Sequence, residues 1–139
     1  MTKKFKYCLA MLAIAFATPA FSHAGHGDGF SAGLMHPLMG IDHVLAMLAV
    51  GLRAALRGGH ARWAWPLTFV SAMAGGFFLA QANFAAPMLE QMIASTVILL
   101  GAAIALRLSA PIIFGAGIIA LAGTAHGFAH GLEVQGALI

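Results

Sequence analysis

Residues 36–52 read HPLMGIDHVLAMLAVGL, a histidine-bearing signature that leads directly into an apolar run. A second signature, HGFAHGLE at residues 126–133, closes another apolar run that begins at Ile112. Histidine and carboxylate side chains are costly in hydrocarbon, so those inside a membrane span are candidates for function. Imidazole and carboxylate groups also bind divalent transition metals. Together, the two signatures indicate a membrane protein that handles a metal ion.

The composition of the 139-residue chain is typical of a membrane protein. Hydrophobic residues make up 61% and charged residues 8% of it, whereas a soluble domain carries about 25% charged residues. A helix needs about 20 apolar residues to cross a bilayer. We expect four spans, at about residues 34–52, 63–80, 88–106 and 112–130. The predicted fold is an all-α membrane protein, a bundle of transmembrane helices over residues 34–139, and no nucleic-acid partner is expected.

The N-terminus has the pattern of a cleavable signal peptide, predicted over residues 1–22. A basic start and a short apolar stretch end in small residues that suit cleavage. The mature chain would then begin with a His/Gly-rich periplasmic arm at residues 23–33, HAGHGDGFSAG. This arm could capture a metal, or it could be only a polar linker. The single cysteine, Cys8, lies in the signal, so we expect neither a disulfide nor a thiolate metal site.

Basic residues set the expected orientation. Arg53, Arg57 and Arg62 flank the first connection and Arg107 begins the third, while residues 81–87 carry no base. The positive-inside rule therefore places the first and third connections in the cytoplasm. The mature N-terminus, the second connection and the C-terminus would face the periplasm, with the chain in a bacterial inner membrane. Both signatures then lie in the outer half of the bilayer.

Helical spacing places the candidate ligands on two stripes that could face each other. His36 and His43 lie seven residues apart in the first predicted span. His126, His130 and Glu133 are spaced i, i+4 and i+7 at the end of the fourth, so they share one helix face. Such a set of nitrogen and oxygen donors suits Ni²⁺, Co²⁺, Cu²⁺ or Zn²⁺.

Two further carboxylates complete the predicted set. Asp42 lies on the flank of the first stripe, where it could orient a ligand imidazole or bind metal after a local kink. Glu90 begins the third span from the same side, and a role in the ion path and a simple helix-capping role both stay open. The predicted metal residues are His36, Asp42, His43, Glu90, His126, His130 and Glu133.

Short connections and small residues predict how the helices pack. Short links favour antiparallel packing of successive helices. The triplets Ala74-Gly75-Gly76 and Gly115-Ala116-Gly117 would let helix backbones approach closely. Gly40, just before His43, could open space beside the site.

At this point the string HPLMGIDHVLAMLAVGL, after a signal-like start and a His-rich stretch, closely resembles the HupE/UreJ family, and HGFAHGLE is similar to that family's second signature. The resemblance covers essentially the whole chain. It implies a secondary permease for nickel or cobalt, linked to maturation of hydrogenase or urease, with Ni²⁺ as the expected ion. It also implies that His36, Asp42, His43, His130 and Glu133 carry transport.

The resemblance also leaves alternatives open. Family members usually continue for a further pair of helices, so this chain could complete its path by self-association as a homo-oligomer, or bind metal as a sensor or donor without transporting it. We expect no enzyme and no resident cofactor, and no Gly-x-x-x-x-Gly-Lys-Ser/Thr loop is present for ATP. A haem-binding redox bundle with axial imidazoles and a histidine-box di-iron enzyme are the other classes considered.

Overall fold

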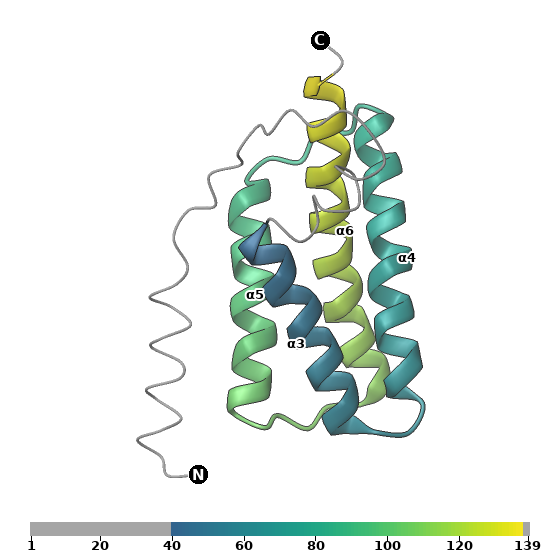
Figure 1. Cartoon of the computed structure of the whole chain (residues 1–139), viewed down its shortest axis with the longest axis vertical. Helices are drawn as coiled ribbons and strands as arrows, with labels where there is room; N and C mark the ends of the chain where they lie inside the picture. Colours follow the sequence, from purple (N-terminus) through teal and green to yellow (C-terminus); the bar gives the residue numbers. More distant parts are fainter. Residues whose placement is uncertain (1–39, 138–139) are drawn as a thin grey trace.

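The computed structural model describes residues 40–137, which form four helices joined by short connections (Figure 1). No strand occurs among these residues, so the all-helical prediction is confirmed for the described part of the chain. The predicted signal peptide, the His/Gly-rich arm and His36 lie outside the described residues. The helices are α3 (Ile41–Arg57), α4 (Ala61–Gln81), α5 (Leu89–Ala105) and α6 (Ile112–Ala137).

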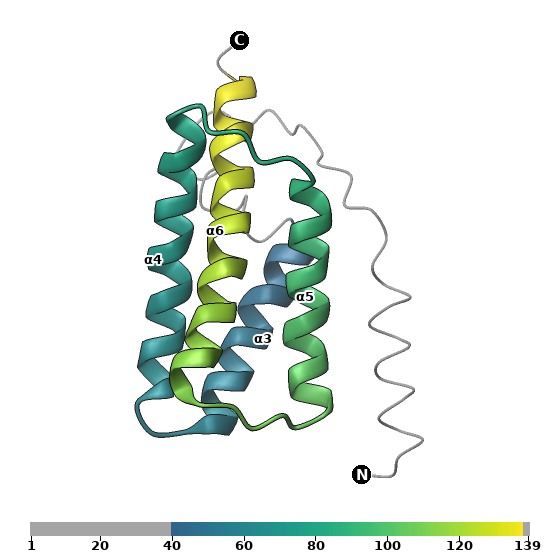
Figure 2. The ribbon, with the colours of Figure 1, turned by 180° about the vertical axis from the view of Figure 1, so that it is seen from behind.

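Two of these helices, α4 and α6, are long and apolar enough to cross a membrane. The other two have 17 residues each, which is at the short end of the range of about 17–25 residues that spans a bilayer. The connection at residues 58–60, which Arg57 and Arg62 flank, and the connection at residues 106–111, which contains Arg107, lie together at one end of the bundle (Figures 1 and 2). We call this the inner end, following the predicted orientation, and the end where α6 finishes the outer end.

The inner end of α3 lies further along the chain than expected. The bases suggested a connection from Arg53, but α3 continues to Arg57 and stops at Gly58, whose φ of 73° suits glycine. The helix continues because Ala54 is buried in the core and Arg53 finds partners inside the fold. The Arg53 guanidinium donates a hydrogen bond to the carbonyl of Leu108 and lies 6.0 Å from the Trp65 ring centroid.

The outer end of α6 also extends beyond the predicted boundary at His130. Two glutamines clamp it to the end of α4. Gln81 Nε2 donates to the carbonyl of Gly131 over 3.0 Å, and Gln135 Nε2 donates to the carbonyl of Ala80 over 2.9 Å. Because each amide reaches the backbone of the opposite helix, α6 stays helical and attached to α4 past the second signature.

The largest helix interface joins α4 and α6, which run parallel to each other. Glycines allow this close approach, since a Cβ on Gly127 would overlap the backbone of Met73 and one on Gly76 would overlap the backbone of Thr124. Small residues at such contacts let membrane helices pack by close van der Waals contact. The two glycines of the second signature that follow its histidines therefore serve the packing of α6 against α4.

The predicted glycine contacts are confirmed in part. In each triplet one glycine faces a neighbour: Gly76 packs on α6, and a Cβ on Gly115 would lie 2.5 Å from the Trp65 ring. A Cβ on Gly75 or Gly117 would meet nothing within 4 Å in the described structure. Each residue along a helix turns the side-chain direction by about 100°. Gly75 and Gly76 therefore point about 100° apart and Gly115 and Gly117 about 200° apart, so the two glycines of a triplet do not face the same neighbour.

The expectation that successive helices are neighbours is wrong for α4 and α5. No contact joins these two helices, and α6 lies between them in both views (Figures 1 and 2). The connection at residues 82–88 runs across α6 to reach α5. Glycine packing explains this order. The glycines let α4 and α6 approach each other closely, so α6 rather than α5 lies beside α4.

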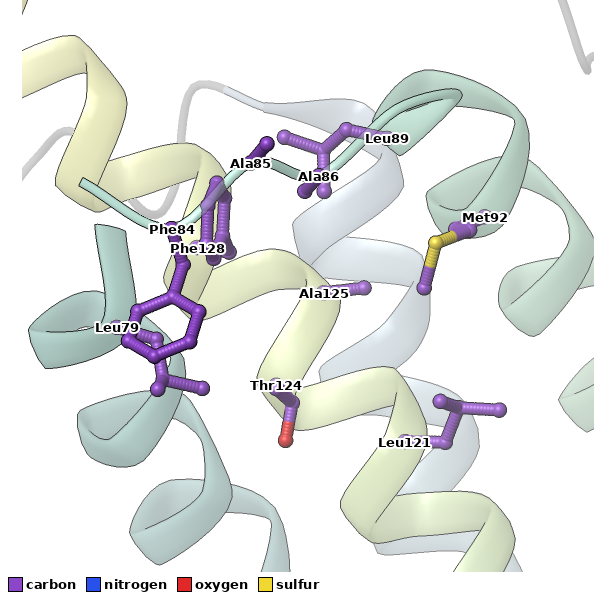
Figure 3. Close-up of a pocket in the computed structure, with 10 residues that line it drawn as sticks. All are labelled: Leu79, Phe84, Ala85, Ala86, Leu89, Met92, Leu121, Thr124, Ala125 and Phe128. Atoms are coloured by element: carbon purple, nitrogen blue, oxygen red, sulfur yellow. The ribbon is translucent and has the colours of Figure 1, made fainter. Parts of the chain in front are cut away.

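An apolar hollow remains beneath this connection, between α5 and α6 (Figure 3). Its volume is about 210 Å³. Thr124 is the only residue with a polar side chain among those that line it, and the others include Phe84, Met92, Leu121 and Phe128. Because none of its lining residues is a histidine or a carboxylate, this hollow is not a site for a metal ion.

Candidate functional site

Three imidazoles from two helices meet inside the outer half of the bundle. His43 lies in the first turn of α3, and His126 and His130 lie one turn apart on α6. The His43 ring centroid is 5.4 Å from that of His126 and 4.9 Å from that of His130. The structure thus brings together the described histidines of both signatures, while His36 lies outside the described residues.

The inner two histidines are almost completely buried. His43 is 3% exposed and His126 is 2% exposed. His126 Nδ1 lies 2.9 Å from the carbonyl oxygen of Ala122, one turn earlier in α6. Because a carbonyl oxygen only accepts, Nδ1–H donates this hydrogen bond. The other ring nitrogen, Nε2, is buried and has no hydrogen-bond partner among the described residues.

His130 and Glu133 form a pair at the outer side of this cluster. His130 Nδ1 lies 3.1 Å from Glu133 Oε2, and their side chains are 21% and 39% exposed. A carboxylate that accepts the Nδ1 proton of a histidine fixes the orientation of the ring, as it does for many metal-binding histidines. The role of Glu133 toward a metal stays a prediction.

Asp42 has a local role in this structure. Its Oδ1 accepts the backbone N–H of His43 at 2.9 Å, at the start of α3. A negative charge in the first turn also stabilises a helix. A Cβ on Gly40 would lie 3.0 Å from the same oxygen, so the glycine leaves room for the carboxylate rather than for an ion. Among residues 40–137 no contact between Asp42 and an imidazole is observed, and the role of Asp42 toward a metal stays a prediction.

Glu90 is not brought into the cluster. It is exposed in the first turn of α5, where its charge suits a helix N-terminus. Within residues 40–137, no three histidine, cysteine or carboxylate side chains are already arranged to hold a metal ion. The His43 ring contacts the rings of His126 and His130 in this structure, and the roles of the three imidazoles as metal ligands stay predictions.

Sequence reasoning missed Phe69, which borders the cluster from α4. Its ring centroid is 6.2 Å from that of His43 and 6.0 Å from that of His126. Nothing in the sequence distinguishes it from other phenylalanines in apolar runs. It was also not evident that Gln81 and Gln135 clamp the helix that carries His126 and His130.

The fold and the cluster define a helical membrane protein with imidazoles buried in its core. The family profile described as HupE / UreJ protein matches residues 9–138. Protein HupE from Rhizobium leguminosarum bv. viciae is 41% identical over 133 residues, which cover 95% of this chain and 70% of that protein. No solved structure matches the chain.

The chain therefore belongs to the HupE/UreJ family, as its two signatures predicted. This is a family of membrane metal transporters associated with nickel or cobalt uptake for hydrogenase or urease, and it is not an enzyme family. Membership favours metal transport over the haem-binding and di-iron alternatives.

Proposed function

We propose that this chain takes up a divalent transition metal ion, with nickel as its main substrate, across the bacterial inner membrane for hydrogenase or urease maturation. The observation that carries the proposal is the meeting of His43, His126 and His130 from two helices inside an apolar bundle. Imidazole nitrogen is a good ligand for Ni²⁺ and Co²⁺. Buried polar groups of this kind are expensive in a membrane and persist where they serve an ion path.

The exposure of the candidate ligands suggests the route by which an ion reaches the cluster. Glu133 and His130 are open to the surface near the outer end, while His43 and His126 are buried behind them. A hydrated cation would first meet the Glu133–His130 pair. It would then exchange water for the nitrogens of the inner imidazoles, after small rotations that aim them at one point.

The remaining predicted residues have supporting roles in this proposal. His36 precedes the described residues by a few positions in the chain and would add an imidazole near the mouth. Asp42 would supply negative charge beside His43, and Glu90 would attract cations to the outer end. The arginines gather at the opposite end, so the carboxylates at this end are not neutralised by them.

Uptake of radiolabelled nickel by cells that express the chain tests the proposal. We expect accumulation above an empty-vector control, with competition by cobalt and weaker competition by zinc. Equilibrium binding of nickel to the purified protein should be measured in parallel. Binding without accumulation would favour the alternative of a metal sensor or donor, and the absence of both in a correctly inserted protein would contradict the proposed function.

Asp42 allows a prediction that separates its charge from its hydrogen bond. In Asp42→Asn the side-chain oxygen still accepts the His43 N–H, and only the favourable charge at the helix N-terminus is lost, so thermal stability should fall only slightly. Nickel affinity should fall about 10- to 100-fold, as it does when a supporting carboxylate is lost from a metal site. Asp42→Ala should lose the same affinity and also about 1 kcal/mol of stability with the hydrogen bond. Wild-type nickel binding by Asp42→Asn would show that the carboxylate only caps α3.

A further inference from the structure

Phe69 occupies the inner side of the imidazole cluster. It is buried, and its ring packs against the rings of both His43 and His126. Its backbone is level with Gly123, where a Cβ would lie 2.5 Å from the Phe69 carbonyl oxygen. His126 is three residues further along α6, about 4.5 Å closer to the outer end at 1.5 Å per residue. Phe69 therefore lies just below the cluster.

The bundle below Phe69 is closed and apolar. The buried core there includes Val50 of α3, Trp65 of α4, Leu100 of α5 and Ile119 of α6. Among residues 40–135, the buried polar side chains are those of His43, His126 and Thr96. The Thr96 hydroxyl already donates to the carbonyl of Ile93 in its own helix, over 2.8 Å. In the described part of the bundle, no chain of buried polar groups therefore continues from the cluster toward the inner end.

The two sides of the cluster thus differ in access. Toward the outer end, exposure rises from His126 to His130 and to Glu133. Toward the inner end, a cation that leaves the imidazoles meets the face of an apolar layer. Moving a charge into such a layer without ligands or water is strongly unfavourable.

We propose that the Phe69 ring closes the inner side of the cluster, so that a cation moves onward only when this ring is displaced. The proposal rests on the proposed function for the identity of the cation. In this proposal the barrier belongs to α4, which contributes no candidate ligand. The barrier holds the cation at the cluster before it moves on. Displacement of a single aromatic ring would join the cluster to the space around Val50, about 10 Å further inward along α3.

The barrier can be tested without any metal by cysteine labelling in right-side-out membrane vesicles. In a Cys8→Ser background, Val50→Cys reports access below Phe69, and Glu133→Cys reports access above it. A charged, membrane-impermeant thiol reagent should label Glu133→Cys readily and Val50→Cys hardly at all. Adding Phe69→Ala should speed labelling of Val50→Cys by about tenfold or more, because a buried thiol in apolar surroundings is inert until water reaches it.

Phe128→Ala is the matched control, because Phe128 is also a buried phenylalanine but lines the apolar hollow beside α5. It should leave labelling of Val50→Cys unchanged. Equal acceleration by Phe128→Ala would reduce the effect of Phe69→Ala to general loosening and overturn the proposal. Slow labelling of Val50→Cys in both variants would overturn it as well.

Transport gives the second readout. Phe69→Ala should bind nickel as the wild type does but accumulate it several-fold faster, whereas the larger ring in Phe69→Trp should slow accumulation without weakening binding. A parallel loss of binding and transport in Phe69→Ala would overturn the barrier role. If the wild type failed to bind nickel while labelling behaved as expected, the proposed function would fail and the closure by Phe69 would be upheld.

Discussion

Replacing His43 with alanine should reduce nickel accumulation to the level of cells without the protein. His43 is the only described histidine of the first signature, and its ring contacts both imidazoles of the second. Its removal leaves the described imidazoles of the cluster on a single helix, α6. Since even a lost supporting partner costs about 10- to 100-fold in metal affinity, loss of a direct ligand should cost at least about 100-fold. Equilibrium binding to the purified variant measures this loss.

The matched control for this prediction is His60→Ala. His60 is exposed at the inner end, just before α4, and lies outside the cluster. This variant should bind and accumulate nickel normally. Correct folding of both variants should be checked by their thermal unfolding in detergent. Wild-type accumulation by a correctly folded His43→Ala protein would remove the imidazole cluster from the transport path.

Gly127→Ala should produce the largest loss of stability among single methyl additions to the bundle. The new Cβ would overlap the backbone of Met73, and neither helix has a flexible side chain at that point that could move aside. Overpacking typically costs about 1–3 kcal/mol, and the upper end is expected here because backbone meets backbone. The melting temperature in detergent should fall, and α4 and α6 should separate.

Gly117→Ala provides the comparison on the same helix. A Cβ there meets nothing within 4 Å in the described structure, so the methyl group only adds helix propensity. Its melting temperature should equal or slightly exceed that of the wild type. If Gly127→Ala and Gly117→Ala unfolded at the same temperature, the close contact between α4 and α6 would not exist in solution.

The sequence predicts the four helices and their approximate positions, because apolar runs of this length have few alternatives in a membrane. The first helix, however, begins at Ile41 after an extended Gly40, and not near residue 34 as predicted. The sequence does not predict the order of the helices in space. Gly76 and Gly127 can each be recognised as small residues, but nothing in a single helix tells which partner its glycines face. The predicted helix ends are also wrong where a long side chain, such as that of Arg53 or Gln135, donates a hydrogen bond to a distant segment of the chain.

The candidate site, like the fold, can be predicted from the sequence only in part. His43, His126 and His130 stand out because imidazoles in apolar runs are costly, and their spacing predicts shared helix faces. The local hydrogen bond of Asp42 competes with any longer-range role, and only the structure shows which contact is made. Phe69 could not be identified, because an aromatic side chain that packs on imidazoles looks in sequence like any other core residue.

The unequal helix interfaces determine what sets the spacing of the three imidazoles. His126 and His130 belong to α6, which packs closely on α4 through glycines. His43 lies on α3, whose contact with α6 is the smallest among the helix pairs that touch each other. The spacing between His43 and the other two imidazoles is therefore set mainly by how α3 packs on α4 and α5, and hardly by direct contact of α3 with α6.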